Sequence, residues 1–195
     1  MVGPYKKLEP LPVFKNKEFC GSSVPDESLL VNVDGGIENA VVILHGASNH
    51  FEKSSRKIVL DNKACRFAPH VQVARLGSEV VLRNSDPILH DVHARLNSNT
   101  LFNVGLPTWR QVKRRLTKAG IVKIECEVLH TWMSAFIVVT SSPYFAVTGA
   151  DGRFSIAGVP VGDYELEVWH ERLGRQSKTV TILEGLRSEV NFDFP

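Results

Sequence analysis

No stretch of the sequence holds the roughly 18 uncharged apolar residues that a membrane-spanning helix needs. The most apolar segment, residues 121–140, is interrupted by Lys123, Glu125 and Glu127. The first residues also lack the apolar centre of a signal peptide, because proline and lysine are frequent there. We therefore expect no insertion into a membrane, and either a cytosolic protein or one whose signal peptide has been removed.

A strong charge bias is missing as well. The 195 residues carry a formal net charge of +2 with neutral histidines, which is too small to favour nucleic acid or a membrane surface as a partner. Glycine-rich phosphate-binding loops, C-x-x-C-H haem attachment and H-E-x-x-H zinc motifs are absent. Since no nucleophile is paired with a base either, we expect no enzymatic activity.

Cysteine is scarce, with three residues in the chain. These could form one disulfide and leave one special thiol, or remain three free thiols. Cys126 lies among other potential metal ligands, whereas Cys20 and Cys65 do not. We therefore expect a Cys20–Cys65 disulfide and a reduced Cys126. A disulfide implies an oxidising compartment, which favours the periplasm and a removed signal peptide.

Most apolar runs that are present have the pattern of β-strands. Val122 and Ile124 fall on one face of an extended chain, with Lys123 and Glu125 on the other, which is the period of a half-buried strand. Helix signals are weak, and only residues 109–116 could form a turn or two. The chain is therefore predicted to be all-β. Similar runs separated by turn signals predict further strands near residues 31–44, 67–73, 80–82, 135–139, 145–147, 154–156, 164–169, 179–183 and 189–194.

One short segment concentrates metal-binding chemistry where a strand ends. Cys126, His130 and Met133 supply a thiolate, an imidazole and a thioether within this segment. Two histidines, a cysteine and a weak axial methionine make up the blue-copper arrangement. The second histidine must come from elsewhere, and His90 offers it soon after the run that ends at Asn84. These four side chains are the predicted ligands of one copper ion.

The two segments together resemble the cupredoxins. In that family a strand ending in asparagine leads to a His-Asn-Val ligand segment, and Cys, His and Met follow later on one loop. The resemblance implies a Greek-key β-sandwich in which the cysteine and both histidines are equatorial ligands and the methionine is axial. Asp91 replaces the usual asparagine, so the hydrogen bond that normally ties the two ligand loops together is in question. The matching residues are Asn84, His90, Asp91, Val92, Cys126, His130 and Met133.

Other uses of the same donors remain open. The C-x₃-H-x₂-M spacing also resembles half of the binuclear copper A loop of cytochrome oxidase, but Val122 stands where that loop has another cysteine, which favours one copper. Zinc on Cys126, His90 and His130 is a second alternative, although the methionine favours copper. A cysteine and a methionine that only fill the core are a third.

The remaining histidines and a tryptophan give weaker signals. His93 is expected at the surface or in support of a ligand. His70 is expected to be a hydrogen-bonded strand residue, with a role at the metal as the alternative. Trp132 lies inside the metal loop, and we expect it to pack rather than to carry electrons. The other histidines are expected to be exposed: His45, His50 and His170.

A second module follows the copper segment. Residues 148–156 and 158–166 closely resemble carboxypeptidase regulatory-like domains, which are small transthyretin-like sandwiches without a catalytic role. Residues 33–44 resemble the opening strand of such a domain. The resemblance implies a second antiparallel β-sandwich made of residues 28–48 and 143–195. The cupredoxin unit, residues 55–142, would be inserted into it, and residues 1–27 would form an N-terminal extension.

The predicted function is one-electron transfer by a mononuclear copper protein. The whole arrangement is similar to periplasmic cupredoxin-like proteins that are sometimes labelled methylamine-utilisation proteins. We expect a redox partner protein such as a cytochrome or an oxidoreductase, which the basic residues 113–115 could steer if it is acidic. The alternatives are a copper enzyme or sensor with an open coordination position, and a structural sandwich whose metal motif is a relic.

Overall fold

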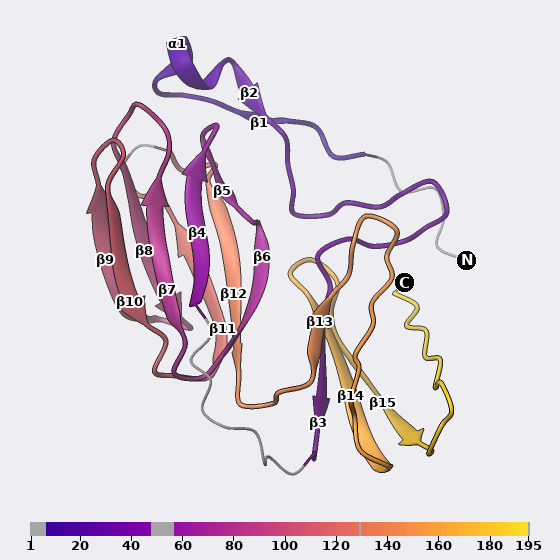
Figure 1. The fold of residues 1–195 in the computed structure, drawn as a ribbon. Helices are drawn as coiled ribbons and strands as arrows, with labels where there is room; N and C mark the ends of the chain where they lie inside the picture. The colour runs from indigo at the N-terminus through magenta and orange to yellow at the C-terminus, as the bar shows by residue number, and fades with distance from the viewer. Residues whose placement is uncertain (1–6, 48–56, 129, 195) are drawn as a thin grey trace. The chain divides into compact units, whose positions relative to one another are not determined.

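The computed structural model describes residues 7–47, 57–128 and 130–194, and β-strands make up nearly all of the regular structure there (Figure 1). The one helix within these ranges, α1, spans Lys17–Cys20. No helix in the described ranges is both long and apolar enough to cross a membrane. The prediction of an all-β protein is confirmed.

Two compact units make up the chain, each with its own hydrophobic core. Among the described residues, the site unit contains residues 9–27, 57–128 and 130–141. The split unit contains residues 7–8, 28–47 and 142–194, so the site unit separates its parts along the sequence.

Two sheets with a common core form the site unit. Leu60 and Leu82 come from one sheet and Ile124 and Ile137 from the other, and all four are fully buried in the same cluster. Neighbouring strands are antiparallel except in the pairs β4–β7 and β6–β12. The first sheet has the order β10 (Gln111–Arg115), β7 (Glu79–Asn84), β4 (Lys57–Lys63) and β5 (Arg66–Ala68), and the second has the order β6 (Val71–Arg75), β12 (Ser134–Thr140), β11 (Gly120–Glu125), β8 (His90–Leu96) and β9 (Asn99–Leu106).

Strand β11 places the cysteine of the metal segment. Val122 and Ile124 point into the core and are fully buried, whereas Lys123 is exposed and Glu125 is half-buried, as the alternating pattern predicts. Cys126 follows the strand directly and is also buried. The strand thus delivers the thiol to the interior at the point where the loop begins.

Two local predictions in this unit are wrong. Residues 109–116 contain strand β10 rather than helical turns, because pairing with β7 along its whole length outweighs a weak local preference. Residues 67–73 form two strands rather than one. The break falls at Pro69, which has no N–H group for a continuing ladder, and β5 and β6 belong to different sheets.

Residues 9–27 are part of the site unit rather than a separate extension. Strand β1 (Leu11–Pro12) pairs with β2 (Ser23–Val24), and Val13 and Val24 are buried in the core of the unit. Cys20, the last residue of α1, forms a disulfide with Cys65. The expected Cys20–Cys65 disulfide is the one sign of this packing in the sequence, because no local pattern marks Val13 and Val24 as core residues.

The split unit is built on one four-stranded sheet with the order β13 (Phe145–Val147), β3 (Val41–His45), β14 (Gly162–His170) and β15 (Gly174–Ile182). Strand β3 pairs with both β13 and β14, although the site unit lies between β3 and these two strands in the sequence. Residues 154–156 and 189–194, which are predicted as strands, are not strands in the structure. Their apolar side chains still pack against the core of the sheet.

Two glycine turns of the split unit lie against each other. A Cβ atom added to Gly152, where φ is +73°, would lie 2.5 Å from the Cα atom of Gly36. Asn32 spans the same contact by donating a hydrogen bond to the carbonyl of Ala150 at 3.0 Å. Glycine is therefore required at this approach, which joins the early and late parts of the unit.

Candidate metal centre

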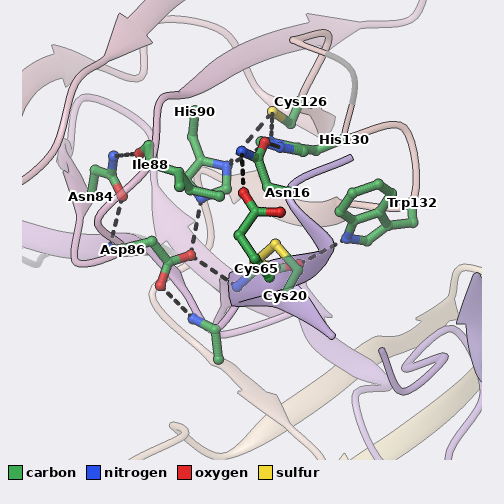
Figure 2. The surroundings of a disulfide bond; sticks show 12 residues. Asn16, Cys20, Cys65, Asn84, Asp86, Ile88, His90, Cys126, His130 and Trp132 are labelled. Atoms are coloured by element: carbon green, nitrogen blue, oxygen red, sulfur yellow. Dashed lines mark hydrogen bonds and ion pairs between the residues drawn. A yellow bond between two sulfur atoms is a disulfide. The ribbon is translucent and has the colours of Figure 1, made fainter. Parts of the chain in front are cut away.

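A buried asparagine fixes the loop that delivers His90. The side-chain N–H₂ of Asn84, at the end of β7, donates to the carbonyl of Ile88 at 2.7 Å (Figure 2). It also donates to the carbonyl of Leu106 at 2.8 Å. Its Oδ1 atom accepts a hydrogen bond from the backbone of Asp86 at 2.9 Å. These bonds hold both ends of the loop, so the ring of His90 enters the interior at the first residue of β8.

The loop that follows β11 is closed by its own backbone. The N–H of Met133 donates to the carbonyl of His130 at 2.9 Å, and the N–H of Cys126 lies 3.4 Å from the carbonyl of Met133. These bonds return the chain toward its starting point. Cys126 and His130 can therefore face a common centre.

Asp91 ties this loop to the strand that carries His90. Its Oδ1 atom accepts hydrogen bonds from the backbone N–H groups of Glu127 at 2.6 Å and Val128 at 3.0 Å. The sequence left open whether an aspartate at this position would keep the bond between the two loops. The structure shows that the bond is present, and a single carboxylate oxygen accepts it from two donors.

Three of the predicted ligands meet in the interior of the site unit (Figure 2). The Sγ atom of Cys126 lies 3.9 Å from Nδ1 of His90 and 3.7 Å from Nδ1 of His130, and the two Nδ1 atoms are 3.1 Å apart. The exposed fractions are 0% for His90 and 2% for both Cys126 and His130. Side chains from two distant segments thus form one buried cluster.

The cluster has the dimensions of a site for one metal ion. Two atoms bound to the same ion lie about 3–4 Å apart when each bond is roughly 2.0–2.3 Å long. All three separations fall in that range. Two imidazoles and one thiol suit copper, and they also suit zinc. The residues present therefore fit a single soft or borderline cation.

Burial favours the neutral forms of Cys126 and His130. It raises the pKa of the Cys126 thiol to about 12. Burial, together with the neighbouring His90, lowers the pKa of the His130 imidazole. A cation that binds here must displace the thiol proton, and the resulting thiolate would balance part of its charge.

The outer nitrogen of each histidine has an acceptor that the sequence analysis missed. Nε2 of His90 lies 3.0 Å from Oδ2 of Asp86, and Nε2 of His130 lies 2.9 Å from Oδ1 of Asn16. Asp86 could have been found as the acidic residue in the loop before His90. Nothing in the sequence points to Asn16, which is 114 residues from its partner.

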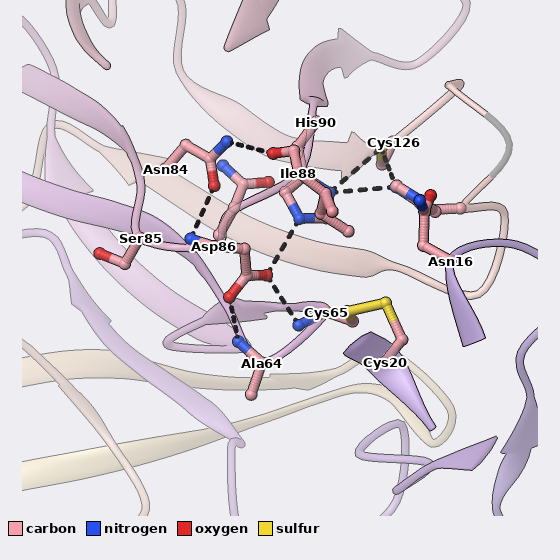
Figure 3. Close-up of polar contacts among 12 residues, drawn as sticks. Asn16, Cys20, Ala64, Cys65, Asn84, Ser85, Asp86, Ile88, His90 and Cys126 are labelled. Carbon is pink, nitrogen blue, oxygen red and sulfur yellow. Dashed lines mark hydrogen bonds and ion pairs between the residues drawn. A yellow bond between two sulfur atoms is a disulfide. The ribbon is translucent and has the colours of Figure 1, made fainter. Parts of the chain in front are cut away.

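Asp86 is itself held in place by backbone groups. Its two oxygens accept hydrogen bonds from the N–H groups of Ala64 at 2.7 Å and Cys65 at 2.9 Å (Figure 3). Burial alone would raise the pKa of Asp86, but the hydrogen bonds from His90 and from these N–H groups outweigh it and hold the pKa below its ordinary value. The carboxylate is therefore charged and rigidly placed.

Met133 and Trp132 complete the surroundings of the cluster. Met133 is buried in the same core as Cys126, and its role as the axial ligand stays a prediction. Trp132 packs as expected, with its ring centre 5.1 Å from that of His130. Its indole N–H donates to the carbonyl of Cys65 at 3.1 Å.

The other described histidines lie outside the cluster. His70 is hydrogen-bonded to the carbonyl of Ser134 at 3.1 Å, although it precedes strand β6 rather than lying in it. His93 is buried rather than at the surface, with Nδ1 2.8 Å from a carboxylate oxygen of Glu127. The expectation of exposure is wrong for His170, which is fully buried, and for His45, which is half-buried. His50 lies outside the described residues.

Several solved structures are similar to part of the chain. A purple cupredoxin from Nitrosopumilus maritimus is 21% identical, covers 43% of this chain and 98% of its own, and has a TM-score of 0.37. A copper-containing nitrite reductase from Thermus scotoductus SA-01 is 18% identical, with 48% and 25% covered and a TM-score of 0.39. An oxidised amicyanin mutant is 19% identical, with 59% and 94% covered and a TM-score of 0.39. These TM-scores are low, so the assignment of a metal depends on the residues alone.

No curated protein matches the chain. The family model of the carboxypeptidase regulatory-like domain matches residues 133–195. This range begins with β12, which the structure pairs with strands of the site unit, and it omits β3, which lies at the centre of the split sheet. The chain therefore carries a carboxypeptidase regulatory-like domain in its C-terminal part.

Proposed function

We propose that the protein binds one copper ion and transfers single electrons. The observation that carries the proposal is the meeting of His90, Cys126 and His130 in one buried cluster. Their donor types are those of a blue-copper site, for which Met133 would supply the weak axial ligand. Bound copper would contribute a one-electron couple between its cupric and cuprous states.

The residues of the chain would set the properties of that couple. The Cys126 thiolate and the two Nδ1 atoms would hold the metal, and the thiolate would supply the strongest electronic coupling to it. All three donors are buried, so the protein excludes water from their centre. Such a site exchanges electrons with a partner through the protein and needs no substrate in contact with the metal, which supports electron transfer over catalysis.

The partner and the compartment follow from the same reasoning. We propose a redox partner protein such as a cytochrome or an oxidoreductase, with no nucleic-acid ligand and no membrane insertion. The Cys20–Cys65 disulfide supports an oxidising compartment. This is the basis for proposing the periplasm.

Titration of the metal-free protein with Cu(II) tests the proposal. We expect one equivalent to bind and to produce an intense visible band from thiolate-to-copper charge transfer. The band should be absent in Cys126→Ser and unchanged in His170→Asn, which removes a buried histidine of the split unit.

Three other results would each contradict the proposal. Lack of copper uptake would favour a structural sandwich. A site that prefers zinc over copper would favour a structural zinc centre. Copper that binds azide with a changed spectrum would have an open position, as an enzyme or a sensor requires.

A further inference from the structure

We propose that Asn16 and Asp86 are positioning residues that orient the two metal-binding imidazoles, and that the Cys20–Cys65 disulfide braces these two contacts against each other. The proposal rests on the proposed metal site and goes beyond it. It adds to the site a hydrogen-bond partner from the N-terminal segment. It also makes the metal centre depend on whether a disulfide that does not contact the metal is formed.

The contact of Asp86 determines which nitrogen of His90 faces the cluster. The carboxylate oxygens already accept hydrogen bonds from two backbone N–H groups, which fix them as acceptors. Nε2–H of His90 donates to Oδ2 at 3.0 Å. Since a neutral imidazole carries one proton, Nδ1 is left with a free lone pair. That lone pair points to Cys126 and His130.

Asn16 acts on His130 in the same way. Its Oδ1 atom accepts from Nε2–H of His130 at 2.9 Å. Its N–H₂ group faces Oε1 of Glu18 at 3.4 Å, which fixes the direction of the amide. The proton of the imidazole is thus held on the outer nitrogen, and Nδ1 is again left as an acceptor.

As a result of these two contacts, the two inner nitrogens have no proton to share. In the tautomers that Asp86 and Asn16 select, the Nδ1 atoms 3.1 Å apart are both acceptors. Neither can donate to the other, and the single thiol proton of Cys126 can be donated to only one of them, so only an added cation can satisfy both. The outer contacts therefore prepare the centre for a metal ion.

The disulfide joins the two segments that carry these acceptors (Figure 2). On one side, the N–H of Cys20 donates to the backbone carbonyl of Asn16 at 2.9 Å. On the other side, the N–H of Cys65 donates to Asp86 at 2.9 Å. The carbonyl of Cys65 also accepts from Trp132, whose ring lies against His130. One covalent bond thus connects the surroundings of both imidazoles.

The two sides of the brace differ in strength. Asp86 lies in a loop that Asn84 holds from within the sheet. Asn16 precedes a helix of four residues, which is too short to be stable without tertiary contacts. Loss of the disulfide should therefore release Asn16 and affect His130 more than His90.

The first test uses the metal-free protein, so that it does not depend on copper binding. Nitrogen NMR of the imidazoles should show the Nε2–H tautomer for His130 in the wild type. The same tautomer should persist in Asn16→Asp, which keeps an acceptor oxygen. In Asn16→Leu and in the double variant Cys20→Ala/Cys65→Ala, we expect a mixture of tautomers for His130, with His90 unchanged.

The second test measures metal affinity in the same proteins. Loss of an outer hydrogen bond to a metal-binding histidine typically weakens binding by about 10–100-fold. We expect this loss for Cu(II) in Asn16→Leu and in the double variant, with most of the affinity kept in Asn16→Asp. Far-ultraviolet circular dichroism checks that each variant folds. If the double variant does not fold, the Asn16 variants, which keep the disulfide, still test the role of Asn16.

The outcomes separate this proposal from the proposed function. A wild type with the predicted tautomers but without copper uptake would overturn the function and keep the positioning roles. An unchanged His130 tautomer in Asn16→Leu would overturn the role of Asn16. A double variant that folds with wild-type tautomers and affinity would overturn the brace.

Discussion

Cys126 is a residue whose surroundings change its acid–base behaviour. Burial raises the pKa of its thiol from 9.0 to about 12. A group whose pKa is higher in the folded chain than in the unfolded chain favours folding while the pH stays below the unfolded value. This contribution is lost as the pH rises through the window between the two pKa values.

We expect this titration to lower the stability of the metal-free protein in alkaline solution. Between about pH 8 and pH 10 the unfolded chain loses a proton that the folded chain keeps, which costs about 1.4 kcal/mol. Urea unfolding at the two pH values measures the change. The serine of Cys126→Ser does not titrate in this range, so the variant should lose about 1.4 kcal/mol less stability between the two pH values than the wild type does. An equal loss in both proteins would contradict the expectation.

Asp91 offers a second prediction for a single side chain, because one oxygen accepts from both Glu127 and Val128. Asp91→Ala leaves two backbone donors of the metal loop without an acceptor. We expect a loss of about 1–3 kcal/mol in the free energy of unfolding. Asp91→Asn keeps an acceptor oxygen and should lose clearly less. If the two variants were equally stable, the hydrogen bonds from Glu127 and Val128 to Asp91 would not contribute to stability.

Residue types explain which parts of the site could be predicted. Cys126, His130 and Met133 lie close together in the sequence, and their donor chemistry is specific, so a metal segment was visible without a structure. Asn16 and His170 were not predictable in the same way. Their environments come from contacts made by tertiary packing, which no local sequence pattern around either residue shows.

At the level of strands, the alternating patterns predicted the interior faces but not every partner. Strand β11 follows its pattern residue by residue. Strand β10 carries no clear pattern, and it is a strand because β7 offers it an edge to pair with. Local sequence thus determines which face of a strand is buried, whereas pairing within the sheet determines whether some segments form strands at all.

Strand β3 allows this distinction to be tested in the split unit. Leu44 is buried in the core of that unit, and we expect Leu44→Ala to cost about 2–5 kcal/mol. Hydrogen exchange should then lose protection mainly in β13 and β14, which flank β3. Leu82→Ala is the matched control, because it removes a buried leucine of the site unit. A uniform loss of protection across both units in Leu44→Ala would contradict the expectation.

For the molecule as a whole, two separate cores predict two separate responses to copper. A ligand at 100 times its dissociation constant stabilises the folded form by about 2.7 kcal/mol. We expect this gain in β8, β11 and β12, which surround the metal cluster, and not in β14 or β15. Hydrogen exchange with and without Cu(II) measures it strand by strand. Protection that rises equally in both units would show that they unfold together.

The larger organisation was visible in the sequence to different degrees. Residues 33–44 resemble the opening strand of a regulatory-like domain, and the structure places β3 in the sheet of the split unit. The place of residues 9–27 in the site unit was visible only through the expected Cys20–Cys65 disulfide. It depends on a disulfide and on two buried valines whose partners lie elsewhere in the chain.

The central place of β3 in its sheet has a consequence for synthesis of the protein. Residues 41–45 leave the ribosome before their neighbours β13 and β14, which emerge only after the last strand of the site unit, β12. Until then, both edges of β3 carry unpaired backbone groups that can join foreign strands. All strands of the site unit are therefore synthesised while β3 of the split unit is still without its partner strands.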